Sequence, residues 1–149
     1  MIGENINYNN KYLKKLITKY HLEEYVILFE QNRNLNFFYS LLDIHLLSSI
    51  SESFPNVIAE SMLCGVPSVA TNVGDIEFII DKFGWIVPNK NPEKLSSAIL
   101  EAVNLKNDNK KWQLLKKNCI EQIDKNFNIA NTIKLYNLCW TSKKVITKN

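Results

Sequence analysis

The amino-acid sequence predicts an α/β fold: a Rossmann-like parallel sheet with helices on both faces, followed by C-terminal helices. Apolar runs of strand length alternate five times with patterns typical of helices, which indicates a parallel sheet covered on both sides. The run Tyr25–Phe29 is continuously apolar, as expected of a parallel strand that is buried on both faces. The length of 149 residues fits a single domain. We expect that domain to span residues 1–141, followed by a disordered tail over 142–149.

The individual elements follow from periodicity and from helix start and stop signals. Four apolar runs predict strands at Tyr25–Phe29, Ile44–Leu47, Ser68–Thr71 and Trp85–Val87. One-sided apolar stripes, an initial proline and a terminal glycine predict helices between them. The expected helices are Lys11–His21, Leu35–Leu42, Asn56–Leu63, Gly74–Asp81, Pro92–Asn104, Lys110–Asp124 and Ile129–Trp140.

The last two expected helices each carry an apolar stripe. In the first of them the stripe comprises Trp112, Leu115, Cys119 and Ile123. In the second it comprises Ile129, Ile133, Tyr136 and Trp140, spaced by four, three and four residues. An exposed stripe of this kind often marks an interaction site, so the final helix is a candidate for recruiting a partner.

Composition excludes some classes of protein and favours one compartment. The net charge is +3 and only one of the eighteen basic residues is arginine, which argues against a nucleic-acid surface. Three cysteines, an odd number without motif spacing, indicate reduced cytosolic thiols. The sequence shows no signal peptide and no apolar stretch approaching eighteen residues, so we expect a soluble cytoplasmic protein. Lysine pairs such as Lys110-Lys111 leave weak peripheral attachment to the inner face of a membrane open.

The strongest functional signal is a pair of carboxylates, Glu52 and Glu60, around the start of one helix. Glu52 lies on the loop after the expected strand Ile44–Leu47, and Glu60 lies about one and a half turns into the helix that follows. Pro55 suits the first helical position, where its missing N–H is not needed. Ligands of open α/β sheets bind at such loops, and helix starts favour phosphates. A nucleotide-sugar, anionic in its middle and rich in hydroxyls at both ends, fits this layout.

A long run of residues around this pair carries a family resemblance. The run comprises Asp43–Ser49, Glu52–Glu60, Ser61–Thr71, Val73–Asp75 with Glu77, Gly84–Pro88 and Pro92–Leu95. From Asp43 to about Val103 the chain resembles the donor-binding half of the family 4 glycosyltransferases, which have the GT-B fold. The resemblance extends more loosely to both ends of the chain.

The resemblance implies roles for individual residues. Glu52 would hold hydroxyls of the donor sugar and is the candidate catalytic residue, whereas Glu60 would hold the ribose hydroxyls. Backbone N–H groups near the helix start would face the sugar and diphosphate. The donor-binding candidates are Gly3, Gln31, Asn32, Glu52, Ser53, Phe54, Pro55, Asn56, Val57, Ile58 and Glu60. Gln31 and Asn32 follow a strand at the ligand-binding edge, and contact with the base and a solvated role stay open for both.

The family also sets expectations for cofactors. Its members resemble one another in retaining anomeric configuration and in needing no bound metal, so we expect a UDP- or GDP-sugar donor and no metal. The sequence has neither an Asp-x-Asp motif nor a His/Cys cluster with ligand spacing. Three positions depart from the family pattern. Ser48 replaces the usual proline before the serine. Ser53 replaces the glycine after the first glutamate and could cap the helix, and Asn5 replaces the second glycine of an early Gly-x-Gly turn.

Purely structural interpretations compete with these roles. Glu52 and Glu60 could be solvated charges that suit the positive end of a helix dipole. His45 could face the donor pocket, although a satisfied core or edge histidine is the favoured interpretation. Three functions are therefore weighed: a donor-binding domain, a non-catalytic interaction module, and a nucleotide-sugar epimerase, which is disfavoured because its catalytic groups cannot be located.

A full GT-B enzyme has two Rossmann-like domains, which sets expectations for activity and partners. Met1-Ile2-Gly3-Glu4 resembles the end of the family's second strand, so we expect the donor domain to be incomplete at its N-terminus. The Arg/Lys pair that neutralises the diphosphate would then be missing, and the chain alone would be a poor catalyst. With an acceptor domain it would transfer a hexose to a glycan or lipid-linked acceptor in surface polysaccharide biosynthesis. The expected partners are that acceptor domain or a second copy bound through the C-terminal helix.

Overall fold

The computed structural model describes residues 1–30 and 34–141 and divides the chain into two compact units, Met1–Phe38 and Tyr39–Asn149. The helix α2, Leu35–Ser40, spans the boundary between these units. The single domain expected over residues 1–141 stays a prediction, and the expected tail at 142–149 lies outside the described residues.

The first unit contains a small parallel sheet and one helix. Strand β1, Ile2–Gly3, pairs in parallel with β2, Phe29–Glu30. Between them lies α1, Lys11–Lys19, and its start is capped by the Asn10 side chain, which accepts from the Leu13 amide at 3.1 Å. Asn5, in the turn after β1, has a φ of 59°. This left-handed conformation favours glycine but tolerates asparagine, so the departure from the family's second glycine is physically accommodated.

The strand expected at Tyr25–Phe29 is the largest error of the sequence-based prediction. The amides of Tyr25 and Val26 both donate to the carbonyl oxygen of Leu22 at 3.0 Å, which makes this part of the segment a turn. Only Phe29 and Glu30 are paired with β1. The Tyr25 side chain is 80% exposed, so the apolar run is not a buried strand.

The second unit is built on a three-stranded parallel sheet. Its strands are β3, His45–Leu47, β4, Ser68–Thr71, and β5, Trp85–Val87, in the spatial order β3-β4-β5. All three lie at the positions expected from their apolar runs, to within one residue. The fold class predicted from the sequence, a parallel sheet flanked by helices, is therefore confirmed.

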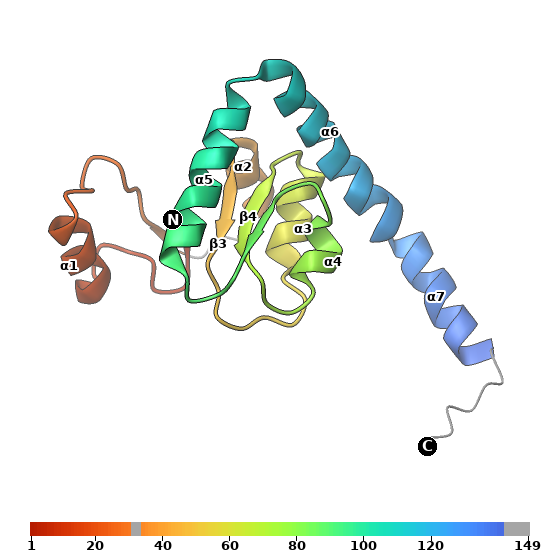
Figure 1. The fold of residues 1–149 in the computed structure, drawn as a ribbon. Coiled ribbons are helices and arrows are strands. Elements are labelled where there is room, and N and C mark those ends of the chain that lie inside the picture. The colour runs from red at the N-terminus through yellow and green to blue at the C-terminus, as the bar shows by residue number, and fades with distance from the viewer. Residues whose placement is uncertain (31–33, 142–149) are drawn as a thin grey trace. The chain divides into compact units, whose positions relative to one another are not determined.

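Helices cover both faces of this sheet (Figure 1). Helices α3, Asn56–Leu63, and α4, Ile76–Ile80, lie on one face, and α5, Pro92–Lys106, lies on the other. The buried strand β4 serves both layers because successive side chains point to opposite faces. Val69 packs with Ala98 and Ala102 of α5, whereas Ala70 belongs to the larger cluster on the other face. That cluster comprises Ile58, Met62, Ala70, Ile76, Ile79, Ile80, Cys119 and Ile123.

Helices α2 and α4 are shorter than predicted, and residues with positive φ flank α4. The helix predicted at Gly74–Asp81 is only Ile76–Ile80, because Gly74 has a φ of 56° and Asp81 a φ of 51°. Helix α2 ends at Ser40 and not at Leu42, whose amide donates to the Tyr39 carbonyl in a turn. Gly65, with a φ of 72°, follows α3 as the expected stop.

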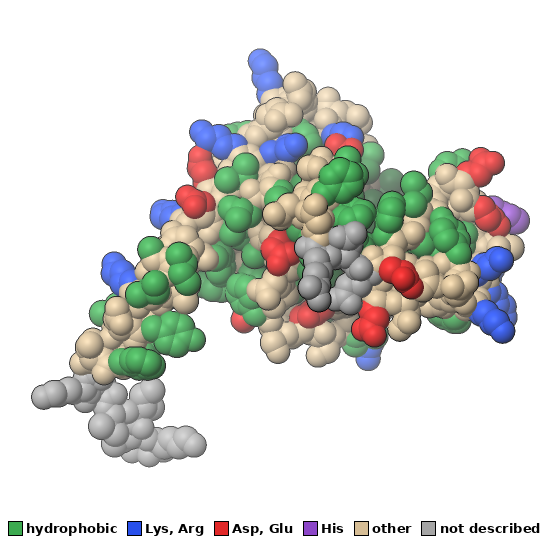
Figure 2. Space-filling model, turned by 180° about the vertical axis from the view of Figure 1, so that it is seen from behind, with side chains coloured by type: hydrophobic (Ala, Val, Ile, Leu, Met, Phe, Trp, Pro, Cys, Tyr) green, Lys and Arg blue, Asp and Glu red, His purple; other side chains and the backbone are tan. Residues whose placement is uncertain are grey.

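The two C-terminal helices differ in how they are packed. Helix α6, Asn109–Asn126, buries Trp112, Cys119 and Ile123, which confirms the predicted stripe. Helix α7, Ile129–Thr141, has no buried residue, and its stripe residue Trp140 is 84% exposed. Figure 2 shows hydrophobic side chains gathered along this helix. Within residues 1–30 and 34–141, no helix has both the length and the apolar character needed to cross a membrane.

Candidate functional site

Hydrogen bonds tie together the loops that follow β3 and β4 in the second unit. The Thr71 hydroxyl, at the end of β4, donates to the Ser49 carbonyl oxygen at 2.6 Å. The Asp75 amide donates to the Ser53 carbonyl oxygen at 2.9 Å. Because parallel strands end at the same edge, these bonds hold the loop from Ser48 to Pro55 at the carboxyl edge of the sheet, where ligands of this architecture bind.

Glu52 lies on that loop with one carboxylate oxygen already held. The Ser49 hydroxyl donates to Glu52 Oε1 at 2.7 Å. Ser49 is itself fixed through its carbonyl oxygen by the buried Thr71 hydroxyl. Glu52 is half-buried, so its second oxygen can still meet a ligand. The loop therefore presents an oriented carboxylate.

Glu60 is held in a comparable way on helix α3. The Tyr39 hydroxyl donates to Glu60 Oε2 at 3.0 Å, across 21 positions of the chain. Tyr39 is only 5% exposed, whereas Glu60 is exposed. The two glutamates that the sequence singles out are thus both hydrogen-bonded to a hydroxyl and both reachable from solvent.

The start of α3 differs in detail from the prediction. Pro55 has a φ of −76° and a ψ of 90°, so it is the residue before the first helical one, Asn56. No side chain accepts a capping hydrogen bond at this helix start, so the expectation that Ser53 could cap it is wrong. The amide of Ile58 donates to the Pro55 carbonyl oxygen at 3.0 Å, and the Ile58 side chain is fully buried. Asn56 and Val57 therefore supply the opening amides of α3.

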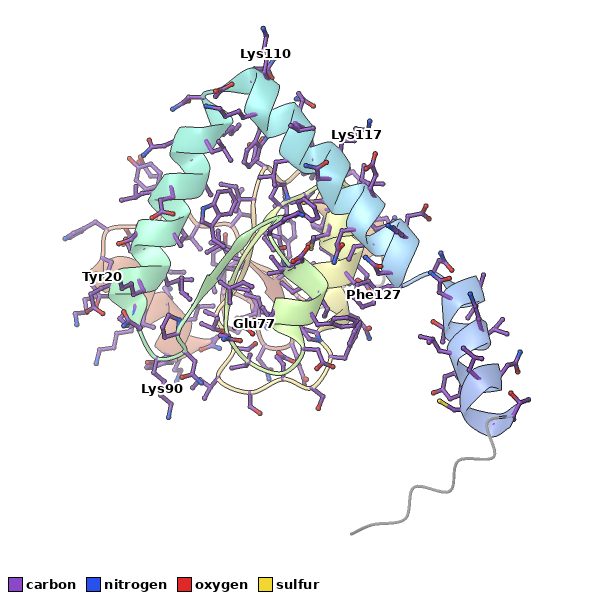
Figure 3. All side chains as sticks on the ribbon, turned by 45° about the vertical axis from the view of Figure 1, so that its right-hand side comes forward. Tyr20, Glu77, Lys90, Lys110, Lys117 and Phe127 are labelled. Carbon is purple, nitrogen blue, oxygen red and sulfur yellow. The ribbon has the colours of Figure 1, made fainter. Side chains whose placement is uncertain are left out.

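The side chain of Phe54 anchors the loop. Its ring lies 5.8 Å from the ring of Phe127, which in turn lies 5.1 Å from the ring of Phe78 on α4. Phe127 is at the junction of α6 and α7 (Figure 3). These contacts use the Phe54 ring for packing and leave its backbone as the part that was expected to face a ligand.

The remaining predicted site residues fall outside this group. Gly3 lies in β1 of the first unit, whereas Glu52 to Glu60 lie together in the second. Gln31 and Asn32 lie outside the described residues. The ligand roles of Gly3, Gln31 and Asn32, and of the eight candidates from Glu52 to Glu60, stay predictions.

A hydrogen bond holds His45 on β3 against β4. Its Nδ1 lies 3.3 Å from Ser68 Oγ, which lies 3.0 Å from the Ser61 hydroxyl on α3. Burial disfavours the charged imidazole and lowers the pKa of His45 to about 4. The side chain is thus a half-buried, neutral, hydrogen-bonded histidine on the edge strand of this sheet, in line with the favoured interpretation.

Sequence reasoning missed the residues that hold the two glutamates. Ser49 and Thr71 had a usable signal, because each is a hydroxyl residue at or just after the end of a parallel strand. Tyr39 had none, since its contact with Glu60 depends on how α2 and α3 come together. Among the described residues, no three His, Cys, Asp or Glu side chains gather as potential metal ligands.

Comparison with protein families decides the family of the chain. Residues 1–119 match the family described as glycosyl transferases group 1. The chain belongs to this family. Its fold, a parallel sheet flanked by helices, matches the solved GT-B glycosyltransferases. A crystal structure of a glycosyltransferase from Rickettsia africae superimposes with a TM-score of 0.81 at 21% identity, covering 96% of this chain and 40% of that one.

Three further proteins are similar to the chain. It is 36% identical over 66 residues to the N-acetyl-alpha-D-glucosaminyl L-malate synthase of Bacillus anthracis, covering 44% of this chain and 17% of that protein. It is 27% identical over 106 residues to a putative colanic acid biosynthesis glycosyltransferase, WcaL, of Salmonella typhimurium, covering 64% and 26%. HepE from Anabaena, crystallised with UDP, gives a TM-score of 0.76 at 22% identity, covering 93% and 40%. The chain therefore spans well under half the length of these proteins.

Proposed function

We propose that this chain is the donor-binding part of a retaining glycosyltransferase. It binds a UDP- or GDP-linked hexose, and the hexose passes to a glycan or lipid-linked acceptor in surface polysaccharide biosynthesis once an acceptor-binding part is present. Membership of the glycosyl transferases group 1 family supports glycosyl transfer as the reaction class. The similarity to WcaL, named for colanic acid biosynthesis, supports a polysaccharide product. HepE, which has the same fold, binds UDP and thereby supports a nucleotide-sugar donor.

The single observation that carries the proposal is the arrangement of Glu52 and Glu60 around the start of α3. Each carboxylate has one oxygen held by a protein hydroxyl, Ser49 for Glu52 and Tyr39 for Glu60. A carboxylate oriented in this way is an acceptor for ligand hydroxyls. The opening amides of α3 lie between the two in sequence and favour an anionic group. A nucleotide-sugar has hydroxyl groups at both ends, on its hexose and its ribose, and an anionic diphosphate between them.

The chemistry assigned to these residues is binding and orientation. Glu52 accepts hydrogen bonds from hydroxyls of the hexose and fixes the sugar relative to its bond with the diphosphate. Glu60 accepts from the ribose hydroxyls, and the amides of Asn56 and Val57 face the diphosphate. No step is assigned to a bound metal. The cytoplasm, with weak attachment to the inner membrane face, is the compartment that we propose.

Two substitutions test the division of roles by calorimetry. Glu60→Ala should weaken binding of the nucleotide and of the nucleotide-sugar alike, by about 1.5–3 kcal/mol, because hydrogen bonds to a charged group are lost. Glu52→Ala should weaken only the nucleotide-sugar. Glu121→Ala is the matched control, since Glu121 pairs with Lys117 on α6. Loss of both ligands to the same degree in both variants would show that the roles are assigned wrongly.

A second candidate function is a non-catalytic module that pairs with a second copy of the chain. The specific observation behind it is α7, which has no buried residue and carries a single charged side chain, Lys134. An exposed apolar stripe of this size on a protein surface is typical of an interaction site. The two functions are separable, because pairing through α7 does not require a donor pocket.

A further inference from the structure

The contact between Tyr39 and Glu60 joins two parts of the chain that sequence patterns do not connect. Tyr39 lies in the last turn of α2 and is 5% exposed. Its hydroxyl reaches Glu60 Oε2 at 3.0 Å. Glu60 itself is exposed on α3, so the bond links a buried donor to a carboxylate that a ligand can reach. A buried hydroxyl that donates a hydrogen bond to an exposed carboxylate orients that carboxylate.

The direction of this hydrogen bond is fixed. Burial, followed by the hydrogen bond to Glu60 and its negative charge, raises the pKa of the Tyr39 hydroxyl well above its ordinary value. Tyr39 therefore stays protonated across the working pH range and can only donate to the carboxylate. Glu60 accepts this bond through Oε2, which leaves its other oxygen for hydroxyl donors of a ligand.

The ring of Tyr39 is held from a second side. His45 packs edge-on against it, with ring centroids 6.0 Å apart and an interplanar angle of 86°. His45 is fixed by Ser68, which is fixed by Ser61 on the same helix as Glu60. A ring supported in this way cannot swing its hydroxyl far from Glu60. The support of Glu60 thus comes from β3, β4, α3 and Tyr39, all in the second unit.

We propose that Tyr39 is a positioning residue that holds the Glu60 carboxylate in place for the vicinal hydroxyls of a ribose, and that it thereby favours ribonucleotides over 2′-deoxyribonucleotides. The inference rests on the proposed function, because it deepens the role of Glu60 in donor binding. A carboxylate held by one oxygen offers the other to a ribose diol with little loss of rotational freedom. A ligand without the 2′-hydroxyl leaves part of that oriented acceptor unused.

The test compares Tyr39→Phe with the parent chain, using UDP and GDP and their 2′-deoxy counterparts. Tyr39→Phe keeps the ring and removes only the hydroxyl. For the nucleotide that the parent binds, we expect a loss of affinity of about three- to tenfold, in line with one hydrogen bond. The 2′-deoxynucleotide should lose less, so that the preference for ribose falls. Tyr136→Phe, on an exposed tyrosine of α7, is the matched control and should change neither affinity.

A double-mutant cycle makes the result specific to the pair. In a Glu60→Gln background, Tyr39→Phe should have little further effect on ribonucleotide affinity, because the carboxylate to be positioned is gone. The same cycle on the free energy of unfolding, measured without ligand, should show coupling between the two residues. An equal loss for ribose and deoxyribose would assign Tyr39 a packing role and overturn the proposal. No binding of any nucleotide by the parent would instead contradict the proposed function, and the role of Tyr39 with it.

Discussion

Gly74 lies so close to Ser53 that no larger residue fits between the loops after β3 and β4. A Cβ placed on Gly74 would lie 2.2 Å from the Ser53 carbonyl oxygen and 2.5 Å from that of Glu52. The φ of Gly74 is 56°, a conformation that side-chain-bearing residues rarely adopt. The adjacent Asp75 amide uses the same closeness to donate to Ser53. The position of Glu52 therefore depends on a glycine more than twenty residues away in the sequence.

Gly74→Ala should disturb the loop that carries Glu52. Gly65 provides the matched control, because its φ of 72° is also left-handed but a Cβ there would meet only side-chain atoms, the nearest at 3.3 Å. The backbone conformation alone should cost each alanine variant about 1–2 kcal/mol in the free energy of unfolding. Gly74→Ala adds a clash with backbone oxygens and should lose clearly more. Chemical denaturation measures the difference, and equal losses would contradict the account of this loop.

His45 should make the stability of the chain depend on pH below neutrality. Its pKa in the folded chain is about 4, lower than the ordinary value of 6.5 because burial disfavours the charged ring. Between these values the unfolded chain binds more protons, so acid destabilises the fold. The loss begins as the pH falls below about 6.5 and continues to about 4, with a slope of up to about 1.4 kcal/mol per pH unit.

The variant His45→Gln isolates this effect, because glutamine cannot titrate. Unfolding free energies of the parent and the variant should be compared at pH 7.5 and 4.5. Between pH 7.5 and 4.5 the free energy of unfolding should fall more in the parent than in the variant. The reason is that the unfolded parent takes up a proton on His45 that the folded parent does not. A constant difference between the two proteins at both pH values would show that His45 is not buried as described.

The exposed stripe of α7 should govern association between copies of the chain. Ile133 is 54% exposed near the middle of this stripe. Ile133→Lys places a charge in any interface that the stripe forms, and it should shift the mass in solution toward the monomer. Leu138 has the same exposure as Ile133, 54%, but lies on the opposite side of the helix, so Leu138→Lys adds the same charge outside the stripe and serves as control. Light scattering across a range of concentrations makes the measurement, and a parent chain that is monomeric throughout would contradict pairing through α7.

The strands and helices were predictable wherever local pattern and burial agree. Ser68–Thr71 and Trp85–Val87 are short apolar runs next to turn residues, and both are strands with the expected bounds. The run at Tyr25–Phe29 is apolar throughout, yet it begins as a turn, because its first amides donate to the Leu22 carbonyl oxygen. Periodicity cannot distinguish such a run from a buried strand, since both are merely apolar.

The candidate ligand-binding residues could be predicted from the sequence, but the residues that hold them in place could not. The spacing of Glu52 and Glu60 is local, because a loop and the helix after it determine it. The hydroxyl that holds Glu60 comes from Tyr39, 21 positions earlier. The loop that carries Glu52 packs against Gly74, where a side chain would clash. Contacts of this kind depend on how separate elements pack, which no pattern in a single sequence records.

The central claim is that this chain binds a nucleotide-sugar through Glu52 and Glu60. Calorimetric titration of the purified chain with UDP, GDP and their hexose conjugates tests it most directly. The account predicts binding of one nucleotide and of its hexose conjugate, with the conjugate's affinity reduced in Glu52→Ala. Absence of binding by all four ligands to a folded chain would contradict the claim.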